Sequence, residues 1–163
     1  MAPSPQKVPD NFHSVTPHLV VKGAKDAIAF YKKAFGATGE DCMTMPGAPD
    51  KVMHAQIQIG DSMIMLADEF SGCSEGPDGS AATPVTLHLY VEDADAVFAQ
   101  AIAAGAKVAM PLADMFWGDR YGQVIDPFGH RWSIATHMHD YTPEEMAKGA
   151  EEMFAAHATA QHG

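Results

Sequence analysis

The sequence has little cysteine, few basic residues and no long apolar run. Its 163 residues include two cysteines, Cys42 and Cys73, which form no CxxC pair and are expected to be free thiols. No apolar stretch reaches the roughly 20 residues that a membrane-spanning helix needs. The first residues lack the basic segment followed by an apolar one that marks a secretory signal. We therefore predict a cytoplasmic protein with no membrane partner.

Basic residues are outnumbered: ten Lys and Arg stand against twenty-one Asp and Glu, which gives a net charge of −11. Beyond Lys32 and Lys33 there is no basic cluster, so a nucleic-acid partner is not expected. The sequence also has no nucleophile elbow of the GxSxG type, no phosphate loop and no dinucleotide fingerprint.

A short stretch occurs twice. Residues 15–21 read VTPHLVV and residues 85–91 read VTLHLYV, and each copy precedes an Ala-rich segment with helical spacing that ends in Gly-Ala. A strand followed by a helix, repeated once, predicts one fold made of two related modules. The repeat also places one histidine, His18 or His88, in the first strand of each module.

Periodicity predicts the remaining elements. Module one should contain a strand at 14–21, a helix with a buried stripe from Ala24 to Phe35, a strand near 39–45 ended by the loop PGAPD, and a hairpin turning at Gly60-Asp61. Module two repeats this order, with KVAMP as a short strand closed by Pro111 and a hairpin turning at residues 126–129. Thr142, Pro143 and Glu145 predict the start of a further helix.

These elements give the domain boundaries. We expect a flexible arm over 1–13, one domain over 14–140, a C-terminal amphipathic helix over 141–157 and a tail over 158–163. Within the domain, module one covers about 14–69, a linker about 68–84 and module two about 85–137.

The segments AIAFYKKAFGA, FWGDRYG and DPFGH, together with the repeat, resemble the vicinal oxygen chelate (VOC) superfamily, which includes glyoxalase I, bleomycin-resistance proteins and extradiol dioxygenases. Within it, the chain is most similar to the PhnB-like branch. The resemblance implies an α+β fold in which two βαβββ modules form a curled mixed sheet with an open cup. It also implies a homodimer and a small organic ligand in the cup.

Strand alternation predicts which side chains enter this cup. Val15, Leu19, Val21 and their counterparts Val85, Leu89, Val91 should face the helices. The opposite face should carry these polar residues: Thr16, His18, His54, Gln56, Gln58, Thr86, His88 and Tyr90.

The resemblance places the four metal ligands of metal-dependent members near Thr16, Met65, Thr86 and Ser133, where no imidazole or carboxylate stands. A hard divalent cation would be poorly held by such a set. His18 and His88 with His54 could form a different site for Zn, Ni, Mn or Fe. The preferred alternative is that these histidines hydrogen-bond an organic ligand, with no resident cofactor.

The FWGDRYG segment adds Trp117 and Arg120, which could stack on or pair with a ligand. Alternatively, Trp117 and Phe116 could close the end of the barrel. The first hypothesis is thus a small-molecule-binding protein of the bleomycin-resistance type. Its predicted ligand-binding residues are His18, His54, Gln56, His88, Tyr90, Trp117 and Arg120. The alternative is a metal-dependent lyase, isomerase or dioxygenase using His18, His88 and His54, so whether the chain is an enzyme stays open.

Overall fold

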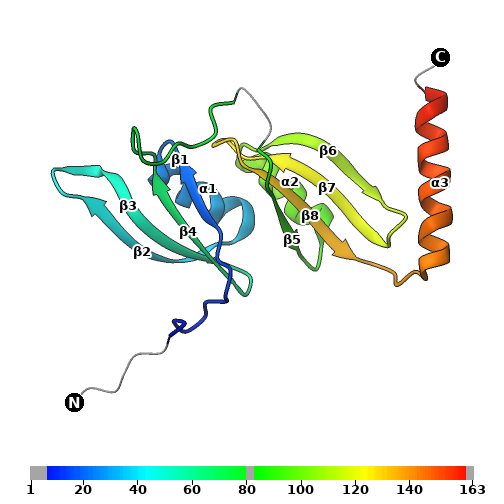
Figure 1. Ribbon diagram of the computed structural model, residues 1–163, viewed down its shortest axis with the longest axis horizontal. Coiled ribbons are helices and arrows are strands. Elements are labelled where there is room, and N and C mark those ends of the chain that lie inside the picture. Colours follow the sequence, from blue (N-terminus) through cyan, green and yellow to red (C-terminus); the bar gives the residue numbers. More distant parts are fainter. Residues whose placement is uncertain (1–6, 80–82, 161–163) are drawn as a thin grey trace.

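The computed structural model describes residues 7–79 and 83–160, and it contains the predicted pair of modules (Figure 1). Module one comprises β1 (His18–Val21), α1 (Ala24–Phe35), β2 (Thr38–Met45), β3 (Ala48–Ile59) and β4 (Ser62–Asp68). Module two comprises β5 (Thr86–Tyr90), α2 (Ala94–Ala104), β6 (Lys107–Asp114), β7 (Asp119–Ile125) and β8 (Arg131–His137), and α3 (Pro143–Ala160) follows. Residues 1–6, 80–82 and 161–163, which fall in the predicted arm, linker and tail, lie outside the described residues.

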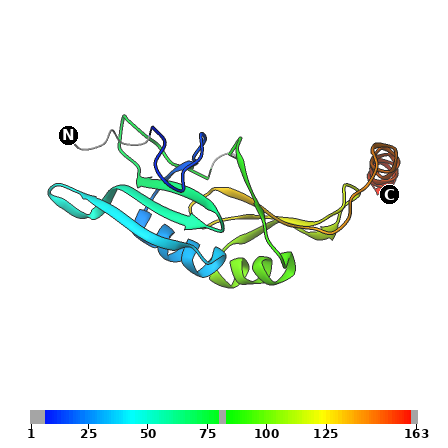
Figure 2. The same ribbon diagram turned by 90° about the horizontal axis from the view of Figure 1, so that it is seen from below.

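Both modules have the same sheet topology, which confirms the α+β fold of paired βαβββ units. The strand orders are β1-β4-β3-β2 and β5-β8-β7-β6. In each sheet the first strand pairs in parallel with the last, and the other pairings are antiparallel. The sheets stay open, with α1 and α2 next to each other on one side (Figure 2). The N-terminal segment and the connection from β4 to β5 lie on the other side, which we call the cup face (Figure 2).

The helices pack as their periodicity predicts. The buried residues of α1 include Ala24, Ala27, Ile28 and Tyr31, and those of α2 are Ala94, Phe98 and Ala101. These helix residues pack against strand side chains that point away from the cup face, including Leu19, Val21, Ala55, Ile57 and Leu66. Trp132 also belongs to this core: it is 2% exposed, and its ring centroid lies 4.6 Å from that of Phe35.

The start of α1 is held by a carboxylate distant in sequence. Its N-cap residue, Gly23, has no side chain, and Asp68 at the end of β4 accepts hydrogen bonds from the N–H groups of Gly23 (2.8 Å) and Ala24 (3.0 Å). Asp68 also accepts from Val52 N–H on β3 at 2.8 Å. Burial raises the pKa of Asp68, but these three bonds and Lys51 outweigh it, so the pKa lies below its ordinary value.

Asp126, in the turn between β7 and β8, joins the two modules. Its carboxylate accepts from the hydroxyl of Tyr31 on α1 at 2.7 Å and from Trp132 Nε1 at 3.0 Å. It also accepts from the backbone N–H groups of Phe128 and His130. Burial and the nearby Asp126 charge raise the pKa of Tyr31 well above its ordinary value. The DPFGHRW hairpin therefore connects module two to the first helix of module one.

Two predictions about the first strands were wrong. Val15 is 85% exposed and Val85 is 66% exposed, whereas both were expected to face the helices. The regular strands begin only at His18 and Thr86, so both valines precede the pleated segments and their alternation does not apply.

Other strand boundaries also differ from the prediction. β6 continues through Pro111 to Asp114, because β6 is an edge strand and Pro111 lies in the irregular stretch between the pairs of Met110 and Ala113 with β7. β3 begins at Ala48, inside the predicted PGAPD loop. Met53 is 39% exposed and occupies a bulge, since Met43 pairs with His54 and the next residue on β2 pairs with Val52.

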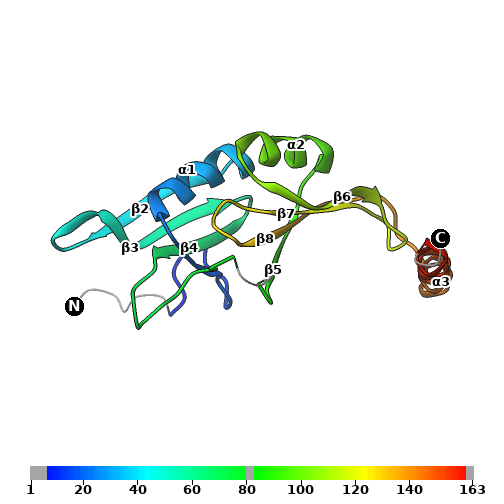
Figure 3. The same cartoon turned by 90° about the horizontal axis from the view of Figure 1, so that it is seen from above.

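The capping box of α3 is confirmed. Thr142 N–H donates to Glu145 Oε2 at 2.8 Å, and Glu145 N–H donates to Thr142 Oγ1 at 3.2 Å. The helix lies at the far end of module two (Figure 3), where a Cβ on Gly149 would come within 2.6 Å of Phe116 Cβ. In the described part of the chain, no helix is both long and apolar enough to cross a membrane.

Candidate functional site

A cleft of about 520 Å³ lies between the two modules and is lined by residues from both faces of β5. Thr16 and Met63 contribute to it from module one, and Thr86, His88 and Tyr90 contribute from β5. Its apolar lining includes Val15, Ile59, Ile64, Leu87, Leu89 and Trp132. An apolar lining with a few convergent polar groups is typical of a small-molecule pocket of this size.

His88 is the best-positioned polar group in this cleft. Its Nδ1 lies 2.8 Å from the hydroxyl of Ser133, its cross-strand partner on β8, and this contact fixes the ring. The imidazole meets Tyr90 edge-on at 4.4 Å and lies nearly parallel to Tyr121 at 5.9 Å between centroids. Because Nδ1 is engaged, Nε2 is the nitrogen that a ligand would meet.

A chain of polar contacts extends from Tyr121 along the same face. Gln123 Nε2 donates to the Tyr121 hydroxyl at 2.7 Å, and Arg131 donates to Gln123 Oε1 at 2.9 Å. Gln123 thereby links an aromatic hydroxyl to a half-buried cation. This side of module two can present both aromatic faces and fixed hydrogen-bonding groups.

Asp119 holds the aromatic side chains in place, and sequence reasoning missed it. Its carboxylate is 4% exposed and accepts from Tyr90 Oη and Trp117 Nε1, both at 3.1 Å. It also lies 2.8 Å from His137 Nδ1, while His137 Nε2 lies 2.9 Å from Asp140. Asp119 and Tyr121 are two positions apart on β7, so their side chains lie on the same face of the strand, and this alternation could have identified Asp119 from the sequence. Within GDRYG, however, an aspartate next to glycine looks like an ordinary turn residue.

The network shifts two pKa values. Hydrogen bonds to Asp119 and Asp140 raise the pKa of His137, with a smaller opposing contribution from desolvation. Desolvation first, then the hydrogen bond to Asp119, raise the pKa of Tyr90. The Tyr90 phenol therefore stays protonated at neutral pH and donates to Asp119.

Arg120, one of the predicted ligand-binding residues, lies on the helix side of β7. Its guanidinium donates to Asp95 on α2 at 2.8 and 3.0 Å and to Asp114 at 3.3 Å. These partners raise the pKa of Arg120. Because the side chain is occupied on the face opposite to Tyr121, we leave it out of the site.

His18, His54 and Gln56 form a separate group on module one. The rings of His18 and His54 meet edge to face at 5.9 Å, and Gln56 Nε2 lies 3.1 Å from His54 Nε2. Within residues 7–79 and 83–160, no hydrogen bond or ring contact joins this group to His88. His18 lines a second cavity of about 470 Å³, bounded by the connection between the modules.

The residues at the four metal-ligand positions do not fit a divalent ion. Thr16, Thr86 and Ser133 offer hydroxyls, and Met65 offers a thioether, which is a soft donor. Ser133 is 1% exposed, and its hydroxyl already contacts His88. Across the described ranges, no three His, Cys, Asp or Glu side chains are grouped so as to hold an ion.

Comparison with known proteins agrees with this architecture. The family model for the "Glyoxalase/Bleomycin resistance protein/Dioxygenase superfamily" matches residues 11–134. The uncharacterized protein Rv0887c of Mycobacterium tuberculosis (strain H37Rv) is 43% identical over 137 residues, covering 82% of this chain and 79% of that protein.

Solved structures share the fold. The Arabidopsis thaliana At5g48480 gene product superposes with a TM-score of 0.60 at 31% identity, covering 76% of this chain and 98% of that one. A Bacillus cereus protein described as a PhnB protein superposes with a TM-score of 0.58 at 21% identity, covering 76% of this chain and 99% of that one. The chain belongs to the glyoxalase/bleomycin resistance protein/dioxygenase superfamily.

Proposed function

We propose that this protein binds a small, planar organic molecule with polar substituents in the cleft between its modules. The observation that carries the proposal is His88, held at Nδ1 by Ser133 and flanked by the rings of Tyr90 and Tyr121. The fold shared with the Bacillus cereus PhnB protein supports placing the chain in the PhnB-like branch.

Each group on the cleft side has a distinct part in this proposal. Aromatic rings attract a planar ligand by stacking and edge contacts worth about 0.5–1.5 kcal/mol beyond the buried area. His88 Nε2 donates to or accepts from one polar substituent. Asp119 holds Tyr90 and Trp117 in fixed orientations before the ligand arrives, which lowers the entropic cost of binding.

The metal-dependent lyase, isomerase or dioxygenase alternative requires His88 in the same ligand set as His18 and His54. In the structure His18 contacts His54 on module one, whereas His88 contacts Ser133 on module two, so the contacts do not support a shared ligand set.

We also propose that the protein forms a homodimer. Members of the superfamily often dimerise, and this chain leaves apolar side chains such as Met43 (57% exposed) and Val85 (66% exposed) in contact with solvent. Light scattering coupled to size-exclusion chromatography tests this: a mass near twice 17.4 kDa supports the dimer, and a mass near 17.4 kDa contradicts it.

The binding proposal is tested by screening a library of planar heteroaromatic compounds against the purified protein by tryptophan fluorescence. A hit should lose at least tenfold in affinity in His88→Ala and weaken in Tyr90→Phe, while His157→Ala, an exposed histidine on α3, serves as the matched control. Trp132 lines the cleft, so its emission still reports binding in Trp117→Phe. Hits that bind His88→Ala as tightly as the wild type would contradict the proposal.

A further inference from the structure

The cup face of module one carries histidine and methionine side chains in neighbouring rows. Cross-strand pairing sets Met43 on β2 opposite His54 on β3, and Gln56 on β3 opposite Met65 on β4. Met65 is in turn paired with His18 on β1. Paired residues on one face have Cβ atoms about 4.5–5.5 Å apart, so these side chains are direct neighbours.

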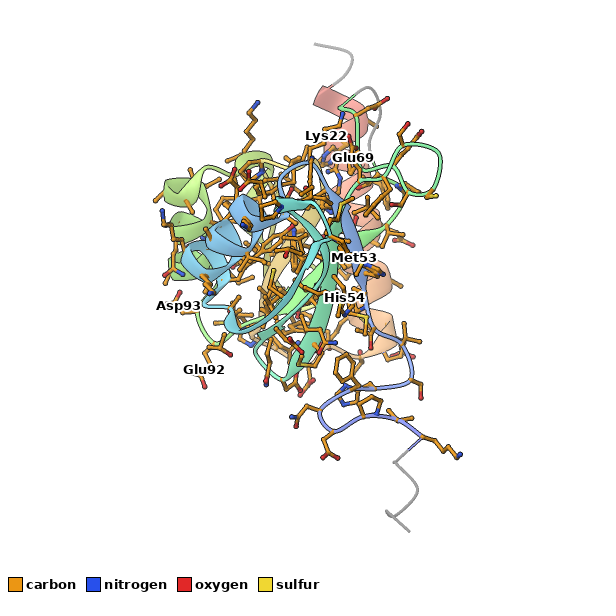
Figure 4. The ribbon with its side chains drawn as sticks, turned by 90° about the vertical axis from the view of Figure 1, so that its left-hand side faces the viewer. Lys22, Met53, His54, Glu69, Glu92 and Asp93 are labelled. Atoms are coloured by element: carbon orange, nitrogen blue, oxygen red, sulfur yellow. The ribbon has the colours of Figure 1, made fainter. Side chains whose placement is uncertain are left out.

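The two imidazoles already approach each other. Their centroids lie 5.9 Å apart, with planes at 88°, so one ring edge points at the other ring. Figure 4 shows His54 on the side of the sheet away from α1. Gln56 Nε2 lies 3.1 Å from His54 Nε2 and donates to it, which leaves the ring proton on Nδ1. Metal binding at Nδ1 requires the Gln56 amide to turn over, so that its oxygen accepts from Nε2–H, as outer-sphere groups of metal-bound histidines do.

Met65 supplies the third donor, because it is the pairing partner of His18 and lies diagonally across from His54. It is half-buried, as is His54, so the donors are neither sealed in the core nor fully solvated. Met43 is 57% exposed beside His54, and its unbranched side chain can swing to add a fourth donor.

We propose that His18, His54 and Met65, with Met43 completing the set, bind one soft monovalent metal ion, Cu(I). Two imidazoles and one or two thioethers are a poor ligand set for Mg, Ca and Mn, which favour oxygen ligands. They also suit Zn poorly, because zinc sites usually combine imidazole with thiolate or carboxylate ligands. Thioethers select Cu(I), which accepts three or four such donors. The site is separate from the organic-ligand cleft, since none of its four donors lines that cleft.

Free thiols also bind Cu(I), and the fold separates them from this site. Cys42 lies between Asp41 and Met43 on β2, so it points to the helix side, where it packs on the core. Cys73 is exposed in the connection after β4. The double variant Cys42→Ser/Cys73→Ser therefore removes both thiols and keeps the proposed donors.

The test is an anaerobic titration of this thiol-free protein with Cu(I) in competition with bicinchoninate. The expected result is one Cu(I) per chain. At least tenfold weaker binding is expected in Met65→Leu, which keeps the volume of the side chain and removes its sulfur, and in His54→Ala. Met138→Leu, an exposed methionine beyond β8, should bind as the parent does.

X-ray absorption of the loaded protein supplies an independent readout. Nitrogen and sulfur neighbours are expected, with the sulfur contribution reduced in Met65→Leu. Failure of the thiol-free protein to compete for Cu(I), or equal affinity in Met65→Leu and the parent, would overturn the proposal. Neither result bears on organic-ligand binding at His88, which is measured separately with metal-free protein.

Discussion

Replacing Asp68 by Asn tests how the fold holds its first helix. The substitution keeps the shape of the side chain, removes the charge and turns one acceptor oxygen into a donor. Oδ1 can still accept from Gly23 and Ala24, but the new amide group then faces the N–H of Val52, which Oδ2 now accepts at 2.8 Å.

The expected loss follows from the burial of these groups. Asp68 is 1% exposed, and both Ala24 and Val52 are fully buried. A hydrogen bond to a charged acceptor contributes about 1.5–3 kcal/mol, and a buried donor left without a partner costs about 1–3 kcal/mol. We expect Asp68→Asn to lower the free energy of unfolding by about 2–3 kcal/mol and Asp68→Ala, which strands all three donors, by about 3–5 kcal/mol.

The pH dependence gives a second, independent expectation. The pKa of Asp68 is lower in the folded state than in the unfolded chain, so its stabilising contribution is fully present above the unfolded pKa of about 3.9. That contribution declines as pH falls below this value towards the folded pKa. The difference between wild type and Asp68→Asn should therefore be largest at neutral pH and shrink in acid.

Urea unfolding followed by circular dichroism at pH 7, 5 and 3 measures both effects. Thr136→Val is the matched control, because Thr136 Oγ1 accepts from Ala94 N–H at the start of α2 at 2.8 Å, as Asp68 accepts from Ala24. It carries no charge, so its cost of about 1–2 kcal/mol should not change with pH. A loss below about 0.5 kcal/mol for Asp68→Asn at pH 7, or a loss that grows in acid, would refute the reasoning.

Two further substitutions test the other carboxylate networks. Tyr31→Phe removes the 2.7 Å bond to Asp126 and should lower stability by about 1–2 kcal/mol in urea unfolding, whereas an unchanged midpoint would show that the link between modules contributes little. His137 has a raised pKa, so its bonds to Asp119 and Asp140 should stabilise the protein fully below the ordinary histidine value of about 6.5, with that contribution lost as pH rises through the higher folded pKa. Thermal unfolding of wild type and His137→Ala should converge at alkaline pH, and a gap that widens there would contradict this sign.

Local pattern was enough to predict the order of elements and most of the core. Apolar spacing placed α1 and α2, and the period-two pattern of residues 53–59 sorted Ala55, Ile57 and Ile59 from the polar face. The same rule failed at Val15 and Val85, because alternation holds only where a ladder keeps the strand pleated. It also missed the Met53 bulge, which depends on the pairing of two strands rather than on the sequence of one.

The candidate site was less predictable because its contacts join residues distant in sequence. Tyr90 and Asp119 lie 29 positions apart, and His88 and Ser133 lie 45 apart. The alternation of side chains along a strand predicts that such residues share a face of the sheet. Which of them are in contact depends on the strand order and the register, which the sequence alone does not give. Arg120 illustrates the opposite case: its motif suggested a ligand contact, and the structure places it against Asp95 on α2.

The register also shows that the two polar faces are versions of one arrangement. His18 is paired with Met65 and Met65 with Gln56; in module two His88 is paired with Ser133 and Ser133 with Gln123. Each glutamine contacts the residue two positions before it, His54 in one module and Tyr121 in the other.

The framework is thus common to both modules, and two of the four positions differ in chemistry: imidazole and thioether in module one, phenol and hydroxyl in module two. Exchanging Met65 for Ser, its counterpart, should therefore weaken Cu(I) binding at least tenfold, as Met65→Leu does, without unfolding the sheet, because the position accepts either residue in the same pairing. A Met65→Ser protein that still retained Cu(I) at parental affinity would mean that the ion is held elsewhere, and that this difference between the modules does not determine metal binding.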